Sequence, residues 1–241
     1  MSQLGLASRR QAEDWIREGR VSINGRPAKL GDKITQEDKL QLDGRAVRQR
    51  AVAETPVFLC NRSPGQALLP RADAMESLAG GLPKRSGRRY LSVSPLPQPD
   101  GGLELLTADG ELAARLQRRV RQLPVEYQLR VRGELAEQQL AGISEGQLDR
   151  GERLQIVSVA AGGGEGANRW YIVQAMGVSG NDLRQLLLRQ GITVSRVLRV
   201  ALGSLRLDRS LARGHSRELM DEELRQLLNP VVTPVPSTPA P

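Results

Sequence analysis

Cysteine and histidine are almost absent from this sequence, and each absence excludes a class of chemistry. The chain of 241 residues contains one cysteine, Cys60, and one histidine, His215. A single cysteine excludes an intrachain disulfide and a cysteine-based zinc cluster. A Ser-His-Asp triad would depend on His215 alone, and the chain has no Gly-x-Ser-x-Gly turn to carry its serine. The sequence therefore gives no support to a zinc protein or a serine hydrolase.

Aromatic residues and long apolar runs are also scarce. Aromatics make up 2% of the chain and hydrophobic residues 39%, so the core must consist mainly of leucine, valine, isoleucine and alanine. No apolar run approaches the roughly 20 residues that cross a bilayer. Arg9 and Arg10 precede any apolar stretch, which is unlike a secretory signal. We therefore expect a cytoplasmic protein with no membrane partner.

Charge is the feature present in excess. The formal net charge is +8 and the sequence pI is about 10.5. A basic balance of this size favours a polyanionic partner, nucleic acid before an acidic membrane surface. Nearly all of the basic residues are arginines. Guanidinium groups suit bidentate phosphate contacts, although the codon usage of a GC-rich genome would produce the same bias.

Residues 1–50 are predicted to form a helix followed by a small antiparallel sheet. Ser8 and Gln11 have the spacing of a capping box, and Gly19 is placed to end the helix. The apolar positions of the helix, at a spacing of three and four residues, are Ala12, Trp15 and Ile16. Strands are predicted through Val21 and Ile23, through Ala28 and Leu30, and through Leu40 and Leu42, with turns at Asn24-Gly25 and Asp43-Gly44.

After a linker at 51–56, residues 57–229 are predicted to form an α+β domain. Strands are expected at 103–106, 126–132, 154–160, 170–176 and 192–201, and helices are expected after Asp109, after Asn181 and through 220–228. The glycine-rich run 162–166 lacks the Gly-Lys-Ser/Thr ending of a phosphate-binding P-loop, so it is predicted to be a hairpin loop. The proline-rich tail 230–241 is expected to be disordered.

The segment from Leu4 to Gly25 closely resembles the alpha-L RNA-binding module first described in a small-subunit ribosomal protein. The match continues through 29–33 and 40–44. The module of that family begins with another helix, so either part of that helix's packing is missing here or the true start lies upstream. In that family the start of the helix and its paired basic residues face phosphates, and the matching positions here are Arg9, Arg10, Arg20 and Lys29. A helix N-terminus attracts anions, and each phosphate contact adds salt-dependent affinity.

These arginines could instead be solvated and neutralised within the helix. Arg9 and Glu13, and Arg10 and Asp14, are spaced as i,i+4 ion pairs. Residues 1–50 contain eleven basic and seven acidic residues, so such pairing would not consume the positive charge. We therefore favour contact with RNA.

Four further segments resemble the ribosomal RNA pseudouridine synthases of the RluB/RsuA type. They are 105–116, the strand 126–131, the segment 182–186 that contains Arg184, and 191–200. Together with the first module they extend the resemblance over about residues 4–228. It implies a mixed or antiparallel sheet with flanking helices, and a monomer that needs no metal or cofactor. It also implies structured RNA as the partner, above all ribosomal RNA or a pre-ribosomal particle.

Active members of that family depend on one aspartate, in the pattern Gly-Arg-Leu-Asp-x-x-Thr-x-Gly-Leu. Aligning Gly102-Leu103 with the end of this pattern puts Pro97 in the aspartate position and Asp100 in the threonine position. A carboxylate nucleophile has no substitute among uncharged side chains. The resemblance assigns base stacking or proton acceptance to Tyr127, and an ion pair with the missing aspartate to Arg184. No catalytic residue is therefore secure.

The sequence thus predicts a ribosomal RNA-binding protein without catalytic activity, acting in ribosome assembly or RNA stabilisation. The alternative is an active synthase that uses Asp100 in a rearranged loop, although a shift by three positions would reverse the facing of an extended segment. A weaker alternative is a remnant whose N-terminal module alone matters, on transfer RNA or a stalled ribosome. The residues predicted to contact RNA are Arg9, Arg10, Arg20, Lys29, Arg88, Arg89, Arg196 and Arg199.

Overall fold

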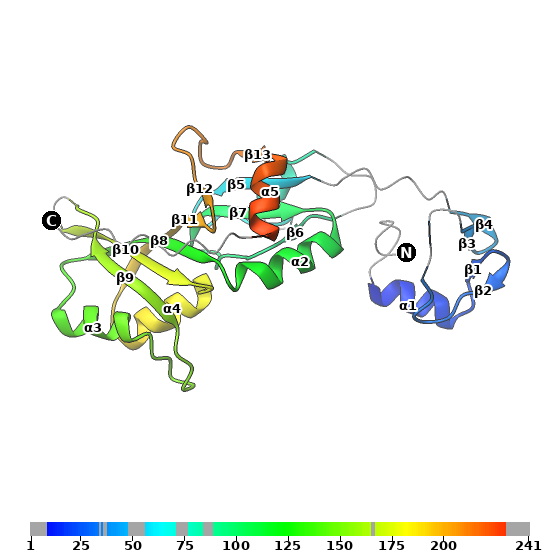
Figure 1. Ribbon diagram of the computed structural model, residues 1–241. Helices are drawn as coiled ribbons and strands as arrows, with labels where there is room; N and C mark the ends of the chain where they lie inside the picture. The colour runs from blue at the N-terminus through cyan, green and yellow to red at the C-terminus, as the bar shows by residue number, and fades with distance from the viewer. Residues whose placement is uncertain are drawn as a thin grey trace.

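The structure is a computed structural model that describes residues 9–33, 35, 38–47, 56–70, 77–83, 89–164 and 167–229. These residues contain two sheets, a small one before residue 48 and a large one after residue 56 (Figure 1). Within the described ranges, no helix is long and apolar enough to cross a membrane. The α+β fold class predicted from the sequence is confirmed.

The small unit consists of one helix and a sheet in the order β2-β1-β3-β4. Its elements are α1 (Arg9–Arg17), β1 (Val21–Ile23), β2 (Arg26–Pro27), β3 (Leu40–Leu42) and β4 (Arg45–Ala46). Both predicted hairpin turns are present, because Asn24 and Asp43 have positive φ of 52° and 50° and each precedes a glycine of positive φ. The predicted second strand through Ala28 and Leu30 is wrong beyond Pro27, where β2 ends, and Leu30 is 51% exposed.

The large unit is a nine-stranded mixed sheet whose main path is β13-β5-β7-β11-β8-β10-β9, with β12 beside β11 and β6 beside β7. Of its neighbouring pairs, β7 and β11 are parallel and the others are antiparallel. The strands are β5 (Val57–Arg62), β6 (Leu91–Ser92), β7 (Gly101–Thr107), β8 (Pro124–Arg132), β9 (Gln155–Ala161), β10 (Asn168–Met176), β11 (Val194–Leu202), β12 (Leu205–Arg206) and β13 (Ser216–Glu218).

Four α-helices and one 3-10 helix accompany this sheet: η1 (Leu78–Gly81), α2 (Gly110–Val120), α3 (Glu137–Glu145), α4 (Gly180–Arg189) and α5 (Asp221–Leu228). Asp109 caps α2, as predicted, by accepting from the N–H groups of Glu111 and Leu112. The predicted cap of α4 is wrong. Ser179, not Asn181, is the N-cap, and its side chain and that of Asp182 form a capping box.

The core lies between the sheet and the helices, and β8 shows how it is divided. Val125, Tyr127, Leu129 and Val131 are buried, whereas the residues that alternate with Leu129 and Val131 are half-buried or exposed. Figure 1 shows α3 and α4 beside β8, β9 and β10, and Leu183, Leu186 and Leu187 of α4 are buried in the same core cluster as the inward side of β8. This side of the sheet therefore carries the helices, and it also carries Tyr127.

Candidate functional site

The loop between β6 and β7 brings Asp100 to Arg184. The N–H of Asp100 donates to the carbonyl of Pro97 at 3.0 Å, and this turn places Asp100 directly before β7. Asp100 is fully buried. Arg184 Nε donates to both carboxylate oxygens of Asp100 at 2.9 Å, and Arg184 Nη2 also donates to Oδ1. The structure therefore joins two residues that lie 84 positions apart along the chain.

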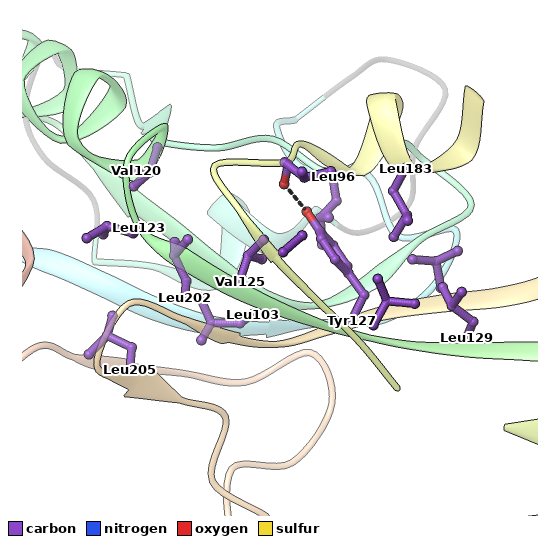
Figure 2. Packing of buried hydrophobic residues seen from close by; sticks show 14 of the residues in the cluster. Leu96, Leu103, Val120, Leu123, Val125, Tyr127, Leu129, Leu183, Leu202 and Leu205 are labelled. Carbon is purple, nitrogen blue, oxygen red and sulfur yellow. Dashed lines mark hydrogen bonds between the residues drawn. The ribbon is translucent and has the colours of Figure 1, made fainter. Parts of the chain in front are cut away.

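Tyr127 lies beside this ion pair but is occupied by the protein itself. Its ring is fully buried, and its hydroxyl donates to the carbonyl of Val178 at 2.9 Å. Figure 2 shows the tyrosine pointing from β8 toward the start of α4, between Leu96 and Leu183. Burial raises the pKa of Tyr127, against the opposing effect of the positive charge of Arg199. In this structure the hydroxyl of Tyr127 links strand β8 to the segment directly before α4.

Pro97, which the family resemblance puts in the aspartate position, packs against the first turn of α4. A Cβ on Gly180 would lie 2.9 Å from Cδ of Pro97 and 3.0 Å from Cδ2 of Leu96. These distances are shorter than or at the limit of ordinary contact, so the close approach requires glycine at position 180. The proline ring therefore occupies the space in front of the helix that carries Arg184.

A buried network of charged side chains also contacts the loop between β6 and β7. Its centre is Glu104 of β7, which is fully buried. Arg62 Nη1 lies 3.2 Å from Oε1 of Glu104, and Arg199 Nη2 lies 3.5 Å from Oε2. The N–H of Leu96 donates to Oε1 of Glu104 at 2.8 Å, and the hydroxyl of Ser92 donates to Oε2 at 3.2 Å. Burial raises the pKa of Glu104, and the two arginines oppose this shift.

The two arginines of this network also bind the main chain of the loop. Arg62 donates to the carbonyls of Leu96 at 2.8 Å and Gln98 at 3.5 Å. Arg199 donates to the carbonyl and to the hydroxyl of Ser94, at 2.8 and 2.9 Å. Glu104 and Arg62 were not singled out from the sequence. The available signal was a lone acidic residue within the apolar run of β7, which needs a buried cation as partner.

The prediction that Arg199 contacts RNA is not supported by its position. The side chain is 1% exposed, and its Nε atom donates to the carbonyl of Leu103 at 2.8 Å. All three guanidinium nitrogens are thus used inside the protein. Arg89 is exposed and Arg196 is half-buried, so both remain accessible, whereas Arg88 lies outside the described residues.

In the small unit, Arg20 has a structural role that the sequence did not indicate. It forms two hydrogen bonds with Asp43, Nε to Oδ1 at 2.8 Å and Nη2 to Oδ2 at 2.7 Å, and it lies 5.5 Å from the centroid of the Trp15 ring. These hydrogen bonds lower the pKa of Asp43. Arg20 therefore ties the β3–β4 turn to α1, and at 40% exposure it still reaches the surface.

The other residues of the small unit that were predicted to contact RNA make fewer contacts within the protein than Arg20 does. Asp14 pairs with Arg17 rather than with Arg10, and within the described residues Arg10 has no ion pair. Lys29 is exposed. Arg9 begins α1, but its side chain and the predicted cap Ser8 lie outside the described part. The described residues also include no group of three or more His, Cys, Asp and Glu side chains that could hold a metal ion.

Comparison with known proteins identifies the family of this chain. The chain is 36% identical over 225 residues to "Ribosomal large subunit pseudouridine synthase B" of Shigella flexneri, covering 91% of this chain and 77% of the relative. It is 37% identical over 224 residues to the protein of the same name from Vibrio cholerae, covering 91% and 70%. The chain belongs to this family. A relative of that name from Pseudomonas aeruginosa is 34% identical over the whole chain, which spans 64% of that relative's length.

Two other comparisons concern the N-terminal unit and the fold. The family model of the S4 domain matches residues 1–40, which confirms the resemblance of the N-terminal unit to an RNA-binding module. A solved structure described as "Crystal structure of pseudouridylate synthase" matches with a TM-score of 0.58 at 24% identity, covering 94% of this chain and 96% of that chain. At this identity the match supports the fold alone. This synthase B homologue thus combines the family scaffold with Pro97, Asp100 and Arg184 arranged as described above.

Proposed function

We propose that this protein binds large-subunit ribosomal RNA in the cytoplasm on a pseudouridine synthase scaffold and does not isomerise uridine. The observation that carries the proposal is the state of Asp100. It is the carboxylate that meets Arg184, yet it is fully buried and held by three hydrogen bonds from that arginine. A nucleophile must touch the reacting atoms of its substrate, and a carboxylate in this state cannot do so without opening the loop.

The loop itself supports the same conclusion. Pro97 in the aspartate position carries neither a nucleophile nor a backbone donor, and its ring packs against Gly180. Glu104 and its two arginine partners anchor the loop from the other side. Opening the loop would therefore expose an apolar contact and strain a buried charge network at the same time.

RNA binding is supported by the S4 domain, by the net charge of +8 and by the named activity of the relatives. The contacts that we propose are Arg9, Arg10, Arg20 and Lys29 in the small unit and Arg89 and Arg196 in the large unit. We propose that the bound protein supports assembly or stability of the large subunit.

The experiment that tests the proposal measures binding and isomerisation on the same RNA. Purified full-length protein is incubated with unmodified large-subunit ribosomal RNA, and pseudouridine is mapped by chemical labelling and primer extension. We expect retained RNA binding with no new pseudouridine. Conversion of any uridine by the wild-type protein would overturn the proposal.

A second function is favoured by one observation, the ion pair of Asp100 with Arg184 beside Tyr127. This is the partnership that the family resemblance assigns to the catalytic aspartate. If the protein is an active synthase through Asp100, Asp100→Asn should abolish conversion while RNA binding persists. Asp208→Asn is the matched control, because Asp208 is an exposed aspartate in the loop after β12 and its loss should leave any conversion unchanged.

A further inference from the structure

Two arginines of the large sheet differ from the other partly buried arginines in their ion pairing. In the part of the chain that the structure describes, every buried or half-buried arginine has a carboxylate partner except Arg130 and Arg196. The paired ones are Arg62, Arg169, Arg184, Arg199 and Arg217. Half-buried cations without a counter-ion are unfavourable in a fold, so the exception needs an explanation.

The two exceptions are neighbours. Arg196 of β11 is paired in register with Arg130 of β8, so their side chains project from the same face of the sheet about 5 Å apart at their bases. Tyr127 and Leu129 on β8 point to the face that carries α4, and the alternation along the strand sends Arg130 to the opposite face. This cluster is therefore separated by the sheet from the Asp100–Arg184 pair.

A third cation adds to them from elsewhere in the chain. The pKa of Arg196 is lowered by burial and by the positive charges of Arg130 and Arg213. Arg213 is exposed and belongs to the loop between β12 and β13. Three hydrogen bonds join this loop to Asn61: the N–H of Gly214 donates to the Asn61 carbonyl at 2.7 Å, the Asn61 N–H donates to the carbonyl of His215 at 2.9 Å, and the Asn61 side chain donates to the carbonyl of Leu211 at 2.7 Å. The charge of Arg213 thus acts on Arg196 from a loop that is anchored to β5.

The hydrogen bonds within the cluster leave donors free for a ligand. Arg130 Nε donates to the hydroxyl of Ser195 at 2.9 Å, and that hydroxyl donates to the carbonyl of Arg130 at 2.9 Å. This arrangement orients the guanidinium of Arg130 and leaves its two terminal nitrogens unused. The side chains of Arg196 and Arg213 donate to no other residue within the described ranges. Planar guanidinium groups with free terminal nitrogens match the oxygen atoms of a phosphate.

An aromatic side chain lies next to the cluster. Trp170 of β10 is paired in register with Arg130 on the other side of β8, and it is half-buried whereas Tyr171, Val173 and Ala175 of the same strand are buried. The indole therefore lies on the same face as the arginines. A partly exposed aromatic ring beside a phosphate-binding group is the combination that binds a nucleotide through its base and its phosphate.

We propose that Arg130 and Arg196, with the added charge of Arg213, form a phosphate-binding site for the RNA backbone, with Trp170 beside it, on the face of the sheet opposite Asp100. The proposal rests on the proposed function for the identity of the ligand, since RNA supplies the phosphate. The phosphate site would be an RNA contact away from the loop that contains Pro97. Loss of catalysis in that loop would leave this contact intact.

The test compares two double variants of equal charge. Arg130→Gln with Arg196→Gln removes the site, and Arg150→Gln with Arg153→Gln is the control, because these exposed arginines follow α3 and Arg153 is bonded to the carbonyl of Glu145 in that helix. RNA affinity is measured at several salt concentrations. In a plot of the logarithm of the RNA association constant against the logarithm of the salt concentration, the slope is negative. We expect the site variant to make this slope shallower by up to about two units, as for two lost phosphate contacts. The control should change the slope less.

A second measurement does not depend on RNA. Thermal unfolding is followed in sodium phosphate and in sodium chloride of equal ionic strength. Phosphate should raise the melting temperature of the wild-type protein and of the control above the chloride value, and it should not do so for the site variant. In chloride the site variant should melt higher than the wild type, because the like charges are relieved.

The outcomes separate the two proposals. If the wild-type protein fails to bind ribosomal RNA but phosphate stabilises it through these arginines, the proposed function falls and the phosphate site stands. If the site variant and the control have equal salt slopes and phosphate stabilises both equally, the phosphate site is overturned whatever the RNA result.

Discussion

The Asp100–Arg184 ion pair predicts an asymmetric response to substitution, because its two members differ in exposure. Arg184→Ala would leave Asp100, whose side chain is 0% exposed, as a buried charge without a partner. Removing one member of a buried pair costs about 3–5 kcal/mol of unfolding free energy. Asp100→Ala would leave Arg184, whose side chain is 29% exposed and can turn toward water, so its cost should be about 1–2 kcal/mol. The arginine variant should therefore be the less stable by about 2 kcal/mol.

The double variant sharpens this prediction. With both groups absent, no buried charge remains, so the double variant should be at least as stable as Arg184→Ala alone. The control is Arg189→Ala on the same helix, because the partner of Arg189 is Asp149, whose side chain is 84% exposed. A surface pair of this kind contributes about 0–1 kcal/mol.

Equilibrium unfolding in urea measures all four variants, with the midpoint and the slope fitted together so that changes in the slope are detected. Equal losses for Asp100→Ala and Arg184→Ala, or a double variant whose loss is the sum of the two, would show that the exposure of the partners does not control the energetics. The burial argument that underlies the proposed lack of catalysis would then fail.

Three further predictions address the loop, the core and the last helix. Gly180→Ala should lower stability by about 1–3 kcal/mol through the contact with Pro97, although alanine is the better helix former; a variant with a higher melting temperature would contradict this. Burial, followed by the charge of Glu104, raises the pKa of the Cys60 thiol to about 12, so a thiol reagent should label the protein only after unfolding, and rapid labelling without denaturant would be the opposing result. Hydrogen bonds from Arg217 lower the pKa of Glu223 in the folded protein. The ionised carboxylate therefore contributes fully to the free energy of unfolding above the ordinary pKa of 4.5. This contribution is lost as the pH falls through the lowered pKa of the folded state. Stability measured down to about pH 3 should therefore fall less for Glu223→Gln than for the wild type, and parallel curves would exclude the contribution of this carboxylate.

The sequence predicted the elements whose signals are local. Apolar spacing located α1, α2, α4 and α5, and the Asn24-Gly25 and Asp43-Gly44 pairs located both hairpin turns. The error at α4 came from choosing Asn181 as the cap although Ser179 and Asp182 have capping-box spacing. Helix α3 was missed because its nine residues contain few apolar side chains, and one of them, Ile143, is buried. Such a helix depends on contact with β9 rather than on its own pattern.

The candidate site was predictable only in part, for a physical reason. The family resemblance identified Pro97, Asp100, Tyr127 and Arg184 as the positions of interest, but spacing along the chain does not determine which side chains meet. The hydrogen-bonded turn from Pro97 to Asp100 is one example, because it determines where the carboxylate of Asp100 lies. The partners of Glu104 come from strands 42 and 95 residues away, and no local pattern indicates such a network. For the same reason the position of Arg199 in a basic segment suggested a surface residue.

The anchoring of the loop before β7 has a consequence for how this segment can vary. Arg62 and Arg199 bind it mainly through the carbonyl oxygens of Ser94, Leu96 and Gln98. Every amino acid supplies a carbonyl oxygen, so these attachments do not depend on which side chains the loop carries. The path of the loop is therefore specified by residues outside it, and its own sequence is free to change without releasing it. A segment held in this way can lose one chemistry, or acquire another, while the domain around it stays folded.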